Sequence, residues 1–120
     1  MLFHYQIRSC YFYQGITDMR KGIDSLSGLV RNELGKNPLE GDLFIFSNKR
    51  KNQLKMLHWQ EDGYGVFYKR LEKGVYELPL RDKIGMEEVL FLLQGIVRKT
   101  IKKHKRYEAN MCISKASKSD

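Results

Sequence analysis

Two adjacent cations, Arg20 and Lys21, stand in the segment TDMRKGID at the expected start of a helix. Helix N-termini normally favour acidic side chains, because their free N–H groups and the helix dipole present positive charge. Gly22, a poor helix former, follows the two cations. Unpaired amides beside two cations would suit a phosphate or another anion. The alternative is a surface cluster in which Asp18 and Asp24 neutralise the pair and add little stability.

A second basic group forms the predicted hairpin tip NKRKN, where Lys49, Arg50 and Lys51 follow one another. Cations at the end of a two-stranded ribbon can reach a nucleic-acid backbone or groove. Basic and aromatic residues continue along the neighbouring strands, where rings can stack on bases and cations can hold phosphates. These residues are Lys55, His58, Trp59, Tyr68, Lys69 and Arg70. The alternative is a tip that only faces water and resists edge aggregation, with Trp59 and Tyr68 in the core or half-buried.

Carboxylates could in principle supply a metal-dependent nuclease, which needs two or three of them. The candidates are Asp18, Asp24, Asp42, Glu61, Asp62 and Glu72. The last four fall at expected turns or strand ends, where acids need no special reason. The chain has no HExxH, paired CxxC, phosphate-loop or nucleophile-elbow motif, and His4, His58 and His104 lack ligand spacing. We therefore predict no catalytic residue, no metal site and no cofactor.

Apolar periodicity predicts the helices that must position these residues. From Met19 to Leu34, apolar residues recur at spacings of 4, 3, 4 and 4, which is the pattern of one helix face. Asp18 or Thr17 is the predicted N-cap, and Gly35 stands where a left-handed C-cap residue belongs. A second helix is predicted for 86–94, with acidic residues in its first turn. A further helix as far as about residue 107 is possible.

Strand-favouring runs alternate with turn residues through the middle of the chain. The predicted strands are Ser9–Gln14, Leu43–Ser47, Gln53–Trp59, Gly65–Leu71 and Val75–Leu78. Short turns between them imply an antiparallel β-meander of about five strands, with one helix after the first strand and one or two C-terminal helices. This is an α+β fold. We expect a single domain over residues 1–96 and a basic C-terminal helix or tail over 97–120, with a disordered end.

Composition limits the classes of protein that fit. The chain has 120 residues, of which 42% are hydrophobic, enough for one core of moderate size. It has no apolar run long enough to span a membrane, and its first residues lack the features of a signal peptide. Two cysteines, Cys10 and Cys112, make neither a disulfide framework nor a complete zinc site. The bacterial cytoplasm is the predicted location.

The net charge of +8 is concentrated in one region. From Val97 to Asp120 there are eight basic and two acidic residues, whereas the preceding 96 residues hold 14 basic and 12 acidic ones. A basic tail on a nearly neutral body favours attraction to a polyanion, most simply nucleic acid. The alternative is a solvated tail that only aids solubility.

Several motifs in order resemble one known family. They are a strand ending in Gly15, then TDMRKGID, a helix through LVRNELG, then GDLFIFSNKRKNQLKMLHW and DGYGVFYKRLEKGVYELP. Over 11–96 the chain is similar to TnpB, the second open-reading-frame accessory proteins of insertion sequence sixty-six family transposons, which are distinct from the RNA-guided nuclease of the same name. The matching positions are Thr17, Asp18, Met19, Arg20, Lys21, Gly22, Asp24, Gly41, Asp42, Phe44, Phe46, Lys55, Trp59, Tyr68, Lys69, Arg70 and Leu71.

The resemblance implies a role in DNA transposition beside a separate, larger transposase, with no catalytic residue in this chain. The segment before Tyr11 and the tail after Val97 depart from the family pattern. Two hypotheses follow. In the first, the protein binds DNA through basic segments, with Arg20, Lys21, Lys49, Arg50, Lys51, Lys55, Lys69 and Arg70 as contacts. In the second, it docks on the transposase or on a sister accessory protein without touching DNA.

Overall fold

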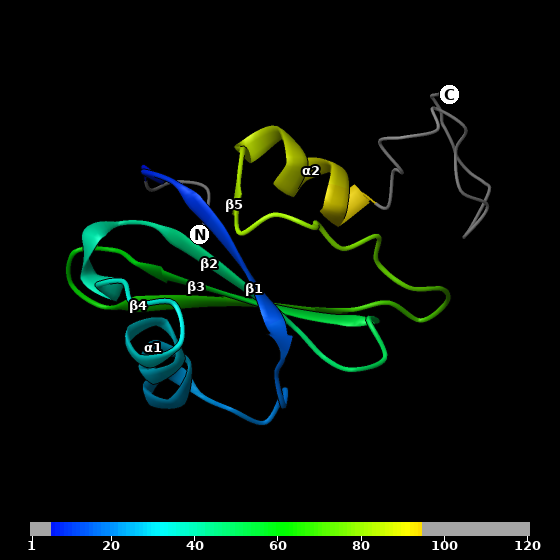
Figure 1. The fold of residues 1–120 in the computed structure, drawn as a ribbon, viewed down its shortest axis with the longest axis horizontal. Coiled ribbons are helices and arrows are strands. Elements are labelled where there is room, and N and C mark those ends of the chain that lie inside the picture. Colours follow the sequence, from blue (N-terminus) through cyan, green and yellow to red (C-terminus); the bar gives the residue numbers. More distant parts are fainter. Residues whose placement is uncertain (1–5, 95–120) are drawn as a thin grey trace.

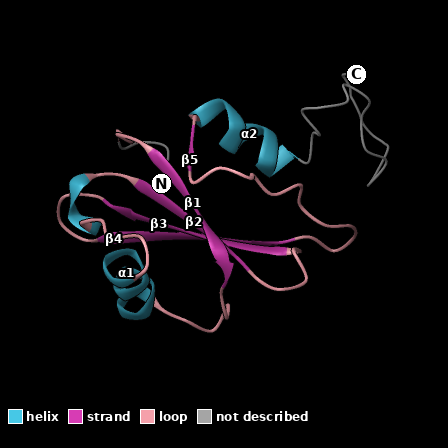
Figure 2. Cartoon of the chain, viewed as in Figure 1, coloured by secondary structure: helices cyan, strands magenta, loops and turns pink. Residues whose placement is uncertain are grey.

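A computed structural model of the chain describes residues 6–94. Within this range one sheet lies between two helices, with helix α1 (Ile23–Asn32) on one face and helix α2 (Met86–Gln94) on the other (Figures 1 and 2). The strands are β1 (Cys10–Ile16), β2 (Leu43–Ser47), β3 (Gln53–Trp59), β4 (Tyr64–Arg70) and β5 (Lys83–Ile84), and a single 3-10 turn, η2 (Pro38–Glu40), precedes β2.

The sheet has the strand order β4-β3-β2-β1-β5. Strands β2, β3 and β4 form an antiparallel meander, and β5 pairs antiparallel with β1. Strand β1, however, runs parallel to β2, with Cys10 opposite Leu43, because the chain returns through α1 between them. The predicted α+β fold is therefore confirmed. The sheet is mostly antiparallel, with one parallel pairing that the predicted meander did not contain.

Alternation along the strands produces a core on each face of the sheet. Towards α2, buried residues of the inner strands pack with Val89 and Leu92. Towards α1, Phe44, Phe46 and Leu57 pack with Leu26 and Val30 of the helix. Both faces of the inner strands are thus buried, and β2 is buried at all five positions. The helical stripe predicted from periodicity is the α1 side of this second core, except for Ile23, which is 40% exposed.

The helix α1 begins later than predicted. Its N-cap is Gly22, so neither Thr17 nor Asp18 caps it. Thr17 is buried and extends the pairing of β1 with β2, while the Asp18 carboxylate accepts the backbone N–H of Arg20 at 2.9 Å. Such a local side-chain bond competes with helix formation. At the other end Gly35 has φ +64°, the predicted left-handed conformation, but the C-cap of the helix is Glu33.

The last predicted strand, Val75–Leu78, is wrong. The chain from Leu71 to Asp82, here called the strap, is irregular and crosses from the β4 edge of the sheet to β1. Its Tyr76 is buried against the α2-side core, and its Asp82 carbonyl accepts the N–H of Phe12 at 2.7 Å. The sequence resembles a strand because side chains of the strap pack on the sheet, but the backbone of this predicted strand crosses the sheet and does not pair with a neighbouring strand. The fifth strand is instead Lys83–Ile84.

The other elements fall close to their predicted bounds. Strands β2 and β3 match to the residue, and helix α2 begins where predicted. Strand β1 starts one residue later than predicted and runs two residues further, through Gly15. The predicted boundary at residue 97, the tail and the further helix all lie outside the described residues. None of the helices in the described range is long and apolar enough to cross a membrane.

Candidate nucleic-acid interface

The parallel pairing of β1 with β2 brings two basic loops to one end of the sheet. Parallel strands end on the same side, so the loop 17–22 after β1 and the loop 48–52 after β2 are neighbours. The N–H of Thr17 donates to the Ser47 carbonyl at 2.9 Å and joins the starts of the two loops. Arg20 and Lys21 are thereby placed at the same end of the sheet as the hairpin tip.

A third segment reaches this end where β4 stops. The N–H of Leu71 donates to the Asn52 carbonyl at 2.8 Å, and the N–H of Tyr76 donates to the Lys51 carbonyl at 2.7 Å. We call the segments 17–24, 48–55 and 70–75 together the basic end, whose loops lie along the bottom and the right of the molecule in Figure 1. Its basic residues are Arg20, Lys21, Lys49, Arg50, Lys51, Lys55, Arg70 and Lys73, against the acidic Asp18, Asp24 and Glu72.

The hairpin tip is shaped by the side chain of Asn48. Its Oδ1 accepts the backbone N–H groups of Asn52 and Gln53 at 3.1 and 3.0 Å, and the N–H of Lys51 donates to its carbonyl at 3.2 Å. Lys51 itself adopts φ +62°. Lys49, Arg50 and Lys51 are exposed, and none of them makes an ion pair with a described residue. The tip therefore presents three unpaired charges on a fixed turn.

Arg20 is different, because Asp18 already holds its guanidinium. Arg20 donates from Nε to Oδ1 of Asp18 at 3.1 Å and from a terminal nitrogen to Oδ2 at 2.7 Å. These hydrogen bonds, with that from the Arg20 backbone, lower the pKa of Asp18 well below its usual range. The alternative of a neutralised surface pair thus holds for Arg20. The prediction that Arg20 and Lys21 stand at the start of the helix is wrong, because both residues precede its N-cap, Gly22.

Lys21 and Lys55 connect the loop to the exposed part of the sheet. Lys21 makes no ion pair with a described residue, and its carbonyl accepts a hydrogen bond from Lys55 Nζ at 2.9 Å. Lys55 Nζ also lies 5.7 Å from the ring centre of Tyr68, whose hydroxyl donates to Gln53 at 2.7 Å. Tyr68 is 48% exposed, so the prediction that it is core or half-buried understates its exposure. Its ring and the Lys55 ammonium together face the α1 side.

Several predicted contacts lie elsewhere. Lys69 points to the opposite face, where its Nζ donates to the Leu93 carbonyl of α2 at 3.1 Å. His58 is buried, with Nε2 at 3.2 Å from the Gly41 carbonyl. Trp59 is half-buried at the other end of the sheet, edge-on to Tyr64 at 5.0 Å between ring centres. The predicted basic and aromatic surface therefore does not include these three residues.

The remaining motif residues have structural or peripheral positions. Met19 packs against the α1-side core, Gly22 is the helix N-cap and Asp24 is exposed in the first turn. Arg70 donates to Glu72 at 3.2 Å, which leaves it partly neutralised. Sequence reasoning missed Lys73, which is exposed beside Gly74 (φ +77°). The turn that these two residues form was the signal that could have identified it.

The opposite end of the sheet is acidic. Arg8 donates to both carboxylate oxygens of buried Asp42 at 3.0 Å and to Glu40 at 3.0 Å. Glu61 and Asp62 are exposed in the turn between β3 and β4. We call 40–42 and 60–64 with Arg8 the acidic end. The six candidate carboxylates are divided between the two ends, and no three metal-ligating side chains among residues 6–94 gather into a possible metal site.

The fold and these two ends define a small α+β domain with oppositely charged ends. Residues 8–103 match the family described as IS66 Orf2 like protein, so the chain belongs to this family, as its resemblance predicted. The chain is 36% identical over 86 residues to the uncharacterized protein y4hO of Sinorhizobium fredii (strain NBRC 101917 / NGR234), covering 68% of this chain and 75% of the relative. It is 32% identical over 83 residues to y4jC of the same strain, covering 66% and 71%. No solved structure matches the chain.

Proposed function

We propose that this protein is a non-catalytic accessory protein of DNA transposition that binds DNA through its basic end. Membership of the IS66 Orf2-like family supports the link to an insertion sequence, whose separate transposase would carry out the chemistry. The observation that supports DNA binding is the meeting of three basic segments at one end of the sheet, produced by the parallel pairing of β1 with β2.

The hairpin tip is the main contact in this proposal. Lys49, Arg50 and Lys51 are exposed and unpaired among the described residues, and Asn48 fixes the turn that carries them. Lys21 and Lys73 flank the tip on either side. Cations at this position would hold phosphates of the DNA backbone and set the orientation of the protein without reading sequence. Arg20 contributes less, because its guanidinium is bound to Asp18.

A salt titration of DNA binding tests the proposal. Mobility shifts are measured for the full chain with element-end DNA and with random DNA at several salt concentrations. The variant K49A/R50A/K51A should bind about a hundredfold more weakly at 0.1 M salt. The slope of log affinity against log salt should be shallower by about 2.7, since binding with three fewer phosphate contacts releases fewer counterions.

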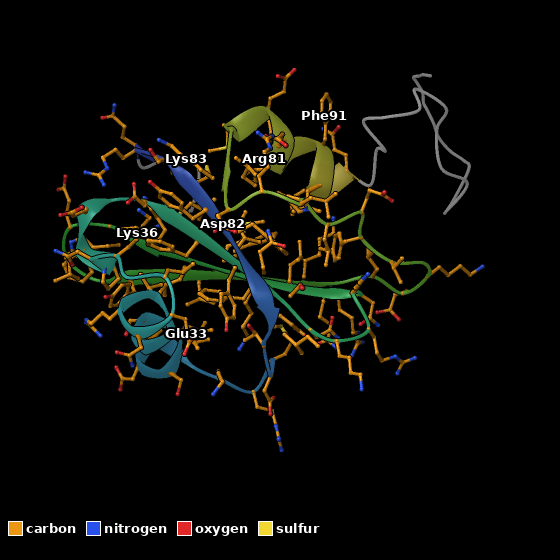
Figure 3. The ribbon with its side chains drawn as sticks, in the orientation of Figure 1. Glu33, Lys36, Arg81, Asp82, Lys83 and Phe91 are labelled. Carbon is orange, nitrogen blue, oxygen red and sulfur yellow. The ribbon has the colours of Figure 1, made fainter. Side chains whose placement is uncertain are left out.

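A matched variant removes three cations at a distance from the basic end. R31A/K36A/K83A causes the same loss of net charge, and Figure 3 labels Lys36 and Lys83 on the side away from the tip. This variant should keep both the affinity and most of the salt slope. Equal losses in the two triple variants would mean that net charge alone attracts DNA. No binding by the unmodified chain at low salt would refute the proposal.

A second candidate function is docking on the transposase or on a sister accessory protein. The observation that favours it is a set of exposed apolar residues, with Ile16 67%, Val75 55% and Leu80 90% exposed. Ile16 ends β1, and Gln14 of that strand donates to the Pro79 carbonyl at 3.4 Å and the Arg81 carbonyl at 3.1 Å of the strap. A pull-down with the transposase would test this function. Capture that survives I16S/V75S/L80S would count against these residues as the docking surface.

A further inference from the structure

Strand β4 forms an open edge of the sheet. The N–H of Leu71 donates to Asn52, and the N–H of Gln60 donates to the carbonyl of Gly63. These bonds mark residues 63 and 71 as members of hydrogen-bonded pairs with β3, and in an antiparallel ladder such pairs recur at every second residue. The backbone N–H and C=O groups of residues 65, 67 and 69 therefore point to β3. The N–H and C=O groups of residues 64, 66, 68 and 70 therefore point outwards. None of them is hydrogen bonded within the described part of the chain.

The edge also lacks the features by which proteins usually block unwanted pairing. Such edges are short, or carry proline, a bulge or a central charge. Strand β4 has seven residues without proline, and its register with β3 is unbroken. The charged residues Lys69 and Arg70 stand only at its end. At its centre, Val66 and Tyr68 are 41% and 48% exposed on the same face. The edge is thus long, regular and apolar at its centre.

We propose that two copies of this chain pair antiparallel through their β4 strands and form a continuous sheet. Pairing centred on Phe67 places Val66 opposite the partner's Tyr68 and Tyr64 opposite the partner's Arg70. In this register the residues with outward backbone groups form the hydrogen-bonded pairs, so every outward N–H and C=O is satisfied. Two pairs of a β-branched and an aromatic residue form across the junction, a combination that stabilises antiparallel sheets.

The charges at the two ends of the sheet favour a second copy of the chain, in the antiparallel direction, as the partner of the β4 edge. Continued beyond the strands, this antiparallel register brings the turn that carries Glu61 and Asp62 of one chain beside the segment with Arg70, Glu72 and Lys73 of the other, so two cations and one anion meet two anions. Parallel pairing would set basic end against basic end and acidic end against acidic end. Opposite charges therefore support only the antiparallel dimer. The two hairpin tips, between β2 and β3, lie at opposite ends of the joined sheet, and the junction uses neither of them. The dimer therefore does not depend on the proposed DNA binding.

Sedimentation and amide exchange test the dimer in the full chain. Sedimentation equilibrium should give twice the chain mass of 14.2 kDa at high concentration and a monomer on dilution. In NMR exchange experiments the amides of Val66 and Tyr68 should be protected in the dimer and exposed in the monomer. The amide of Phe67, which faces β3, is the internal control and should be protected in both.

Two matched lysine substitutions separate this edge from other surfaces. Y68K places a charge at the centre of the junction and should raise the dimer dissociation constant at least about tenfold. L80K makes the same kind of change at a residue that is 90% exposed and lies in the strap beside β1, away from the β4 edge, and should change the constant less than about twofold. V66P removes one outward N–H without removing a bond to β3, and should also weaken the dimer.

Four results would overturn the proposal. The first is a monomer at all concentrations up to the solubility limit. The second is a dimer in which the Val66 and Tyr68 amides exchange as in the monomer, and the third is protection of these amides in the monomer itself. The fourth is equal weakening of the dimer by Y68K and L80K. Loss of DNA binding alone would leave the dimer intact, so failure of the proposed function can be distinguished from failure of this inference.

Discussion

The two ends of the sheet carry opposite charges and use them in different ways. At the acidic end, Asp42 is buried and Arg8 binds both of its carboxylate oxygens. At the basic end, Lys49 and Arg50 are exposed and lack an ion-pair partner among the described residues. One end satisfies its central charge within the fold, whereas the other leaves its central charges available. Pairing, more than the number of charges, therefore distinguishes the end whose charges support the fold from the end whose charges remain exposed.

The largest effect is expected at the acidic end, from removal of Arg8. R8A should lower the free energy of unfolding several-fold more than its control, because it leaves the buried Asp42 carboxylate without its hydrogen bonds to a charged partner. Urea denaturation followed by circular dichroism measures this change. The control E40Q removes the other, exposed partner of Arg8 and should cost less than about 0.5 kcal/mol. A loss in R8A no larger than in E40Q would break the comparison.

A smaller effect is expected when the one strong ion pair at the basic end is released. D18N keeps an oxygen that can accept the Arg20 backbone N–H but removes the negative charge that holds the guanidinium. DNA affinity should rise about threefold at 0.1 M salt, because one more cation is available to phosphate. The mobility-shift titration measures it, with D62N at the acidic end as the matched control. Unchanged affinity in D18N would exclude Arg20 as a latent contact.

The smallest effect is the pH dependence of the Asp18–Arg20 pair. Its hydrogen bonds with Arg20 lower the folded-state pKa of Asp18, whereas an unfolded Asp titrates near about 3.9. The pair therefore contributes stability above about pH 4, and this contribution is lost as the pH falls towards the folded-state pKa. An NMR titration of the Asp18 carboxyl carbon should show it still ionised at pH 3, and R20A should restore ordinary titration. Ordinary titration in the unmodified chain would contradict the pairing.

Local patterns predicted much of the fold. Alternation and turn residues located β2 and β3 to the residue, and the apolar stripe identified α1. The start of α1 was misplaced because the Asp18 side chain forms a local turn that propensity does not reveal. The strap was misread because Tyr76 is buried by packing across the sheet. Buried and exposed residues alternate both in a strand of the sheet and in an extended segment such as the strap. The sequence pattern alone therefore does not show which segment has a hydrogen-bonded neighbour.

The candidate site was predictable only in part. The hairpin tip follows from sequence because its cations are adjacent in the chain. Its nearness to Lys21 depends on the parallel pairing of β1 with β2, a long-range feature without a local signal. The sequence could have predicted that Lys69 and Tyr68 lie on opposite faces of the sheet, since neighbouring residues of a strand face opposite sides. The burial of His58 was not, because it depends on the Gly41 carbonyl from a distant turn.

The strap has a consequence for the order in which the chain folds. Strands β2, β3 and β4 pair across short turns, whereas β5 meets β1 only after the strap has crossed the sheet, with Ile84 opposite Cys10. Closing a longer stretch of chain costs more entropy, and contacts distant in sequence form more slowly. We therefore expect the hairpins to form first and the β1–β5 pairing last. During synthesis, the first strand made would be the last to acquire both of its neighbours.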